Sequence, residues 1–134
     1  MWTHSFEVQT GHRAALVDLS EQVNDALTGL GDGLVHVFLP HATCGLALME
    51  LGSGSEQDLL DRLETILPHN ADYLHRHGSA GHGRDHLLPA FIPPALVLPV
   101  RDNRLALGIW QSLVLVDTNV DNPVRTVRLS FLST

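Results

Sequence analysis

The chain has one cysteine among its 134 residues, so it cannot form an intrachain disulfide bond. An unpaired cysteine is typical of proteins from reducing compartments, and we therefore expect a cytoplasmic protein. The first residues lack the basic and apolar regions of a signal peptide, and no uncharged apolar run approaches the roughly 20 residues of a membrane-spanning helix. These absences exclude a disulfide scaffold and predict that the chain has no membrane partner.

Basic residues are also scarce, with eight lysines and arginines against fifteen acidic residues. The formal net charge is −7 when histidine is neutral. Phosphate backbones are bound by dense patches of lysine and arginine, so we expect no nucleic-acid partner. The same shortage argues against a polybasic protein that binds membrane surfaces.

Hydrophobic residues make up 44% of the chain, which is enough for a buried core, and the length is typical of one domain spanning residues 1–134. Apolar residues at helical spacing predict two helices, over 19–30 and 55–67. Alternating or continuous apolar runs predict about seven strands, at 2–8, 34–39, 44–49, 95–100, 104–109, 110–116 and 127–131. The strands are clustered and do not alternate with helices, which indicates an α+β fold with mostly antiparallel strands.

A polar segment, residues 69–86, has no hydrophobic period and carries five of the nine histidines. A loop of this length in a small domain is usually functional or mobile, and we favour a function. His41 follows a predicted buried strand, while His75 and His86 flank the glycine-rich part of the segment. Three imidazoles with an open fourth position are typical of catalytic zinc sites. His41, His75 and His86 are therefore candidate ligands of a divalent metal, Zn or Mg, although the spacing alone better fits solvated loop histidines that bind nothing.

Cys44 lies three residues after His41, a spacing that admits a Cys–His nucleophile. The strand alternation, however, places Cys44 on the face opposite His41 and Thr43. We therefore predict a packed thiol in the core, where free cysteines are most often found.

Arginines and one aromatic pair are the candidates for substrate contacts. Arg104 and Arg125 could hold a phosphate or carboxylate with two parallel hydrogen bonds, although arginines on strands are more often solvated. Trp110 and Gln111 could line a pocket with a stacking surface and an amide, although a tryptophan in an apolar strand is more often part of the core.

Five short motifs occur in the same order as in the YjbQ family: Pro40–Leu46, Tyr73–His75, Asp85–His86, Leu98–Val100 and Gly108–Gln111. Together they make the chain resemble that family from Trp2 to about Leu132. The resemblance implies an α+β domain with a β-sandwich core that forms a homotrimer. It also implies a weak, secondary thiamine-phosphate synthase activity.

The resemblance further implies roles for single residues. The pocket histidines of the family match His41, His75 and His86, its acidic residues match Glu50 and Asp117, and a basic residue of its last loop falls near Arg125. Our leading hypothesis is a metal-assisted transferase that joins a hydroxymethylpyrimidine diphosphate to a thiazole phosphate and releases pyrophosphate. In that reaction the histidines would hold the metal, with His41 also counted as catalytic, and Glu50 or Asp117 would orient a ligand or move a proton. The expected substrate contacts are Thr43, Arg104, Trp110, Gln111 and Arg125.

The chain departs from the family pattern at Ala42, Met49, Leu51 and Ile109, where apolar side chains replace hydrogen-bonding ones. Loss of such partners changes substrate discrimination strongly. In addition, diphosphate chemistry usually recruits Mg²⁺ through carboxylates, whereas imidazoles suit zinc. Two other functions therefore stay open: a zinc-type hydrolase, and a non-catalytic trimeric protein that binds a metal or small molecule.

Overall fold

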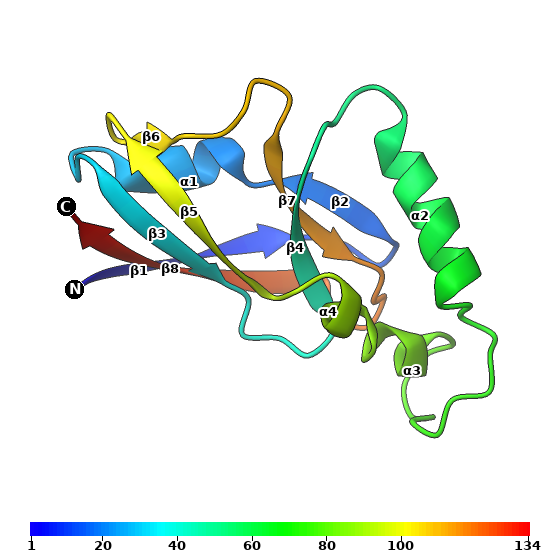
Figure 1. The fold of residues 1–134 in the computed structure, drawn as a ribbon. Helices are drawn as coiled ribbons and strands as arrows, with labels where there is room; N and C mark the ends of the chain where they lie inside the picture. Colours follow the sequence, from blue (N-terminus) through cyan, green and yellow to red (C-terminus); the bar gives the residue numbers. More distant parts are fainter.

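Two antiparallel sheets form the body of the protein in the computed structural model, which describes residues 1–134 (Figure 1). The larger sheet has the strand order β1 (Trp2–Gln9), β8 (Val124–Ser133), β3 (Gly33–Phe38), β5 (Ala95–Arg101) and β6 (Arg104–Leu105). The smaller sheet has the order β2 (Ala15–Asp18), β7 (Ser112–Asp117) and β4 (Cys44–Met49). Every pairing is antiparallel, so the predicted α+β sandwich of mostly antiparallel strands is confirmed.

The main hydrophobic core contains 16 buried residues contributed by both sheets. Strand β7 is buried on both faces because its side chains alternate between two cores. Leu113 and Leu115 belong to the main core, while Val114 and Val116 belong to a second, smaller core. This double burial explains why β7 is a continuous apolar run in the sequence.

Two longer helices cover the sheets. Helix α1 (Ser20–Leu27) buries Val23 and Leu27 in the main core. Helix α2 (Ser55–Ile66) lies at the side of the smaller sheet, where Leu63 packs in the second core (Figure 1). Two single helical turns follow, α3 (His82–Asp85) and α4 (Leu88–Phe91). None of the helices has the length and apolar character that crossing a membrane requires.

The structure differs from the sequence-based elements mainly around β6. Residues 106–111 form a loop, so the predicted strand 104–109 is reduced to two residues and β7 begins at Ser112 instead of residue 110. The loop closes on itself, because the Gln111 N–H donates to the Gly108 carbonyl at 3.0 Å and the Gly108 N–H donates to Gln111 Oε1 at 2.7 Å. Strand β2 has four residues and was not predicted, since so short a strand shows no clear alternation.

The candidate site lies where β4 begins and β7 ends. Cys44 is paired with Asp117 across these strands, and the β7–β8 connection leaves the sheet at the same point. The polar segment reaches this edge through α3, because the Thr118 hydroxyl donates to buried Asp85 at 2.6 Å. The smaller sheet therefore carries the histidine-rich segment at one end.

Candidate metal centre

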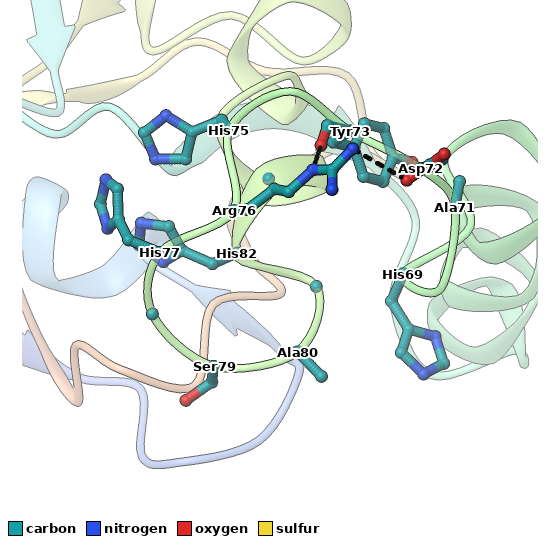
Figure 2. A pocket seen from close by; sticks show the side chains of 13 residues that line it. His69, Ala71, Asp72, Tyr73, His75, Arg76, His77, Ser79, Ala80 and His82 are labelled. Atoms are coloured by element: carbon teal, nitrogen blue, oxygen red, sulfur yellow. Dashed lines mark hydrogen bonds and ion pairs between the residues drawn. The ribbon is translucent and has the colours of Figure 1, made fainter.

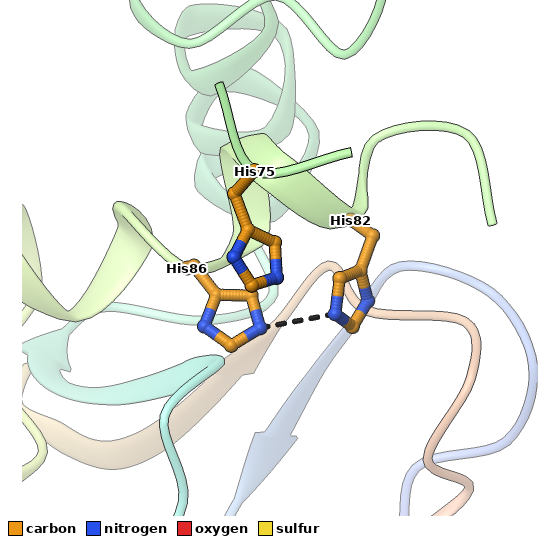
Figure 3. Close-up of side chains that lie close together, drawn as sticks. All are labelled: His75, His82 and His86. Carbon is orange, nitrogen blue, oxygen red and sulfur yellow. Dashed lines mark hydrogen bonds between the residues drawn. The ribbon is translucent and has the colours of Figure 1, made fainter. Parts of the chain in front are cut away.

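Three histidines converge beside α3. The ligand nitrogens of His75, His82 and His86 all lie within 4.8 Å of one another. His82 Nε2 and His86 Nε2 are 3.0 Å apart, and the His75 ring lies against both (Figure 3). We call these three residues the histidine cluster.

The single turn of α3 brings His82 and His86 onto one side, because residues four apart are neighbours on a helix. The turn is closed by the His86 N–H, which donates to the His82 carbonyl at 3.3 Å. Gly83 lets the segment that carries His75 pack directly on this turn. A Cβ at Gly83 would lie 2.8 Å from the Cβ of Tyr73 and would collide with the His75 carbonyl. Residue 83 must therefore be glycine for His75 to reach the other two rings.

A fourth ring, His77, extends the histidine cluster towards solvent. Its centroid is 4.1 Å from that of His75 and 4.7 Å from that of His82. These rings form one wall of an open cavity of about 220 Å³, shown in Figure 2, which Tyr73 and Arg76 also line. The Arg76 guanidinium donates to the Tyr73 carbonyl at 2.8 Å and to Asp72 at 3.1 Å.

His75 and His86 favour the neutral imidazole. Desolvation lowers the pKa of His75, and the nearby charges of His77 and His82 lower it further. Desolvation also lowers the pKa of His86, with further lowering by His75 and His82. Neutral rings keep the lone pair that a metal ligand needs, and binding to zinc requires this form.

The donor set fits zinc or a similar transition metal better than magnesium. Zinc takes imidazole nitrogens at about 2.0–2.1 Å, which places two ligands of a tetrahedral site about 3.3 Å apart. The 3.0 Å between His82 Nε2 and His86 Nε2 is close to this separation. Magnesium prefers oxygen ligands, and no carboxylate belongs to the cluster. The expected divalent metal, Zn or Mg, stays a prediction, and of the two ions zinc is the one that this set of imidazole donors suits.

A polar network lies behind the cluster, in the β7–β8 connection. His82 Nδ1 is 3.1 Å from Asp121 Oδ2 and 3.4 Å from Asn119 Nδ2. Asp85, which is 3% exposed, accepts hydrogen bonds from Asn119 at 3.1 Å, from Thr118 at 2.6 Å and from Arg84 at 3.1 Å. Hydrogen bonds from Ser79 lower the pKa of Asp121, so this carboxylate is ionised at neutral pH. Sequence reasoning missed Asp121, because no motif connects it with the histidines.

A buried ion pair between Arg125 and Asp117 lies next to this polar network. Arg125 Nε donates to Asp117 Oδ2 at 2.7 Å, and Arg125 Nη2 donates to Asp117 Oδ1 at 3.0 Å and to Thr43 Oγ1 at 2.8 Å. The side chains of Arg125 and Asp117 are 0% and 1% exposed, and Arg125 Nη1 has no partner. The predicted substrate residues Arg125 and Thr43 and the predicted catalytic Asp117 therefore lie together, but they bind one another.

His41 lies next to this ion pair and not in the histidine cluster. Its Nε2 accepts a hydrogen bond from the Thr126 backbone N–H at 2.9 Å, and its ring contacts none of the clustered histidines. Burial lowers the pKa of His41, and the charge of Arg125 lowers it further. The structure thus groups His75 and His86 with His82, whereas the sequence analysis had grouped them with His41. The four-residue spacing of His82 and His86 was the sequence signal that identifies this third ring.

The other predicted site residues lie elsewhere. Glu50, Trp110 and Gln111 lie near the opposite end of β4 and β7, where Met49 pairs with Ser112. That end is about 17 Å from the Cys44–Asp117 pair, at about 3.4 Å per strand residue. Glu50 accepts a hydrogen bond from the Ser53 hydroxyl at 3.0 Å, and Trp110 is 70% exposed.

Arg104 lies on the short edge strand β6, where its guanidinium donates to Glu21 at 3.1 Å. This exposed ion pair joins β6 to the first turn of α1. Within one chain, Arg104 therefore has no contact with the histidine cluster.

The fold and the cluster together define a class of protein: a two-sheet α+β domain that presents several histidines at one end of its smaller sheet. Residues 4–134 match the family model described as "UPF0047 protein YjbQ-like", and the chain belongs to this family. It is 52% identical over 132 residues to a UPF0047 protein of Mycobacterium tuberculosis, a match that covers 98% of each chain.

Solved structures support the same assignment. A hypothetical protein from Aeropyrum pernix superposes with a TM-score of 0.88 at 30% identity, over 100% of both chains. A conserved hypothetical protein from Thermus thermophilus superposes with a TM-score of 0.83 at 34% identity, over 96% of this chain and 99% of the other. The resemblance inferred from five motifs is therefore confirmed at the level of family and fold.

Proposed function

We propose that this protein is a metal-dependent hydrolase whose zinc-class ion is held by His75, His82 and His86. The observation that carries the proposal is the convergence of three ligand nitrogens within 4.8 Å beside an open cavity. When bound, such an ion acidifies a coordinated water and polarises a carbonyl or phosphoryl oxygen. Three protein ligands leave a position open for water or substrate, as in catalytic zinc sites.

The residues of the cavity support this chemistry. His77 lies at the edge of the cluster and is placed to take or give a proton in the cavity. Arg76 is the arginine that lines the cavity, where it can bind an anionic part of a substrate by exchanging its contact with Asp72 (Figure 2). The substrate class we infer is therefore a small ester, amide or phosphoester that carries a negative charge.

The thiamine-phosphate synthase-type transfer is the second proposal, implied by the family resemblance of the sequence motifs and compatible with Arg76 at the cavity. The arginines expected to hold its phosphate do not line the cavity, whereas Arg76 does, although Arg76 is itself paired with Asp72. Arg125 is fully buried against Asp117, and Arg104 is paired with Glu21. The imidazole donor set is also better suited to zinc than to magnesium. These contacts support the hydrolase more than the transferase. The third possibility, a non-catalytic protein that binds a metal or small molecule, is distinguished by the activity test below.

Metal binding is tested by zinc titration of metal-free protein and by metal analysis of protein purified without chelator. We expect one zinc ion per chain and a higher melting temperature with zinc, because a ligand of the folded state stabilises it by mass action. His82→Gln should weaken zinc binding at least about tenfold, since it removes one ligand. His41→Gln and the exposed control His36→Gln should bind like the wild type. Less than one metal per three chains, with no thermal stabilisation, would contradict the metal centre.

The reaction is tested with zinc-loaded protein on two substrate sets. One set contains small charged esters and phosphoesters, and the other contains hydroxymethylpyrimidine diphosphate with thiazole phosphate. Turnover of the first set that is lost in His82→Gln supports the hydrolase, whereas pyrophosphate release from the second supports the transferase. Metal binding without turnover of either set would leave the protein as a non-catalytic metal-binding protein.

A further inference from the structure

His82 differs from the other two rings of the histidine cluster in what its outer nitrogen contacts. Its Nε2 faces His86 Nε2 at 3.0 Å, while its Nδ1 lies 3.1 Å from a carboxylate oxygen of Asp121. The His82 side chain is only 14% exposed, so few water molecules compete for this contact. An imidazole between a carboxylate and a metal position is the arrangement that fixes the ring and its tautomer in metal sites.

The tautomer depends on which neighbour pairs with His82 Nδ1. Asn119 Nδ2 lies 3.4 Å from the same nitrogen and could donate to it only if the proton were on Nε2. The Asn119 amide is oriented by its other contacts, because its Oδ1 accepts the backbone N–H of Asp121 at 3.0 Å and its Nδ2 donates to Asp85 at 3.1 Å. The carboxylate contact is shorter and charge-assisted, which favours a proton on Nδ1.

The glycine-rich loop holds the Asp121 carboxylate in place. The Ser79 hydroxyl donates to Asp121 Oδ1, and the Ser79 backbone N–H donates to Oδ2 at 3.2 Å. Gly78 packs directly over the contact, since a Cβ there would lie 2.7 Å from the His82 ring and 3.0 Å from Asp121 Oδ2. Both oxygens of Asp121 are therefore engaged, and one of them lies against His82.

We propose that Asp121 is the positioning residue of the metal centre: its carboxylate accepts a hydrogen bond from the Nδ1–H of His82 and so presents the His82 Nε2 lone pair to the cluster. This inference rests on the proposed function and assigns a role to a residue 39 positions away in the sequence. The sequence had suggested Glu50 or Asp117 for such a role, but Glu50 is bonded to Ser53 and Asp117 to Arg125.

The first test uses metal-free protein, so that it does not depend on metal binding. Nitrogen-15 NMR of the histidine rings, recorded with chelator at a pH where they are neutral, reports which nitrogen carries the proton. We expect His82 to be protonated on Nδ1 in the wild type and to shift towards the Nε2 tautomer in Asp121→Ala. A wild-type His82 with its proton on Nε2, donated to by Asn119, would overturn the proposal.

The second test compares the zinc dissociation constants of Asp121→Ala and of the matched control Asp72→Ala. Asp72 is an exposed carboxylate of the same cavity that pairs with Arg76 and does not contact the cluster, so its variant loses one negative charge without losing the positioning contact. We expect about 10–100-fold weaker zinc binding in Asp121→Ala, the usual effect of removing such a partner, and no more than a small change in the control. Equal losses in the two variants would show a general charge effect and would overturn the proposal.

Asp121→Asn provides a variant of unchanged shape in case the alanine protein does not fold. It keeps one acceptor oxygen without the charge, so its zinc affinity should fall between those of the wild type and Asp121→Ala. The tautomer of His82 and the zinc affinity of the protein also test two proposals separately, namely the metal-dependent hydrolase and the positioning role of Asp121. A wild type that binds no zinc but holds His82 in the Nδ1 tautomer through Asp121 would end the proposed function and support the positioning contact.

Discussion

Cys44 is the only cysteine of the chain, and its side chain is 0% exposed within the main core. Burial raises the pKa of its thiol to about 12. The thiolate is the reactive form of cysteine, so a thiol with this pKa is inert at neutral pH. The alternation of the strand predicted a packed thiol at this position, and the structure confirms it.

We therefore expect Cys44 to resist thiol reagents while the protein is folded. Titration with a chromogenic disulfide should release no rapid colour from native protein and one equivalent per chain after denaturation. The exposed control variant Ser53→Cys should react at once in the folded state. Rapid reaction of the wild-type protein under native conditions would contradict the burial of Cys44.

His41 should make the stability of the protein depend on pH. Its Nε2 accepts the Thr126 N–H, which only the neutral ring can do. Burial lowers the pKa of His41 below the ordinary 6.5, and Arg125 lowers it further. The unfolded chain then binds this proton more readily than the folded chain. Stability that is present above about pH 6.5 is therefore lost as the pH falls through the lowered pKa.

The measurement is the free energy of unfolding by denaturant, with chelator present, at about pH 7.5 and 5.5. The wild type should lose more stability between these values than His41→Gln, whose amide oxygen can also accept an N–H but does not titrate. His75 and His86 also have lowered pKa values, but both proteins retain them, so the difference isolates His41. Identical pH dependence in the two proteins would show that His41 is not held neutral.

At the scale of elements, the Asp117–Arg125 ion pair connects the two sheets. Asp117 ends β7 in the smaller sheet, and Arg125 lies at the start of β8 in the larger one. Thr43, just before β4, accepts a third hydrogen bond from the guanidinium at 2.8 Å. The pair therefore anchors the edge of the sandwich beside which the histidine cluster lies.

Removal of one partner should be costly because the other would stay buried and unpaired. We expect Arg125→Leu to lower the free energy of unfolding by about 3–5 kcal/mol, the range found when one partner of a buried ion pair is removed. The double variant Arg125→Leu with Asp117→Leu should recover much of that loss, since no charge is then left in the core. Chemical denaturation of the three proteins measures both effects, and a single variant as stable as the wild type would contradict the role of the pair.

Helix α3 shows why the sequence did not resolve the site at this scale. A single turn of four residues has no hydrophobic period, so the segment 69–86 was expected to be a loop throughout. The turn is stabilised from outside, by Asp85 against Thr118 and Asn119 of the β7–β8 connection. These partners lie 33 and 34 residues away, beyond the reach of any local pattern.

At the scale of the molecule, the outer face of the larger sheet carries exposed apolar side chains. Leu34 on β3 lies between Pro99 on β5 and Leu132 on β8, with Val97 two residues along β5. Leu34, Val97 and Leu132 are 48%, 59% and 58% exposed in the single chain. Such surfaces are usually covered by association with another chain. The homotrimer implied by the family resemblance stays a prediction.

We expect light scattering coupled to size exclusion to give three times the chain mass of 14.6 kDa. The trimer should persist on dilution, because an interface that covers an apolar sheet face is stabilised by the hydrophobic effect. A mass of one chain at all concentrations would contradict the trimer. The cytoplasmic location and the lack of a nucleic-acid or membrane partner likewise stay predictions of the sequence.

The order of apolar residues was sufficient to predict most strands and both longer helices, because residues that are buried on one face recur with the period of each element. The alternation of the strand also predicted that Cys44 is buried in the core. Five sequence motifs were sufficient to identify the family. The four-residue spacing of His82 and His86 is a local signal, but the approach of His75 to that pair, the Asp121–His82 contact and the pairing of Arg125 with Asp117 were decided only by the tertiary structure. Each depends on which strand ends and loops meet in space, and the local spacing of residues carries no information about those meetings.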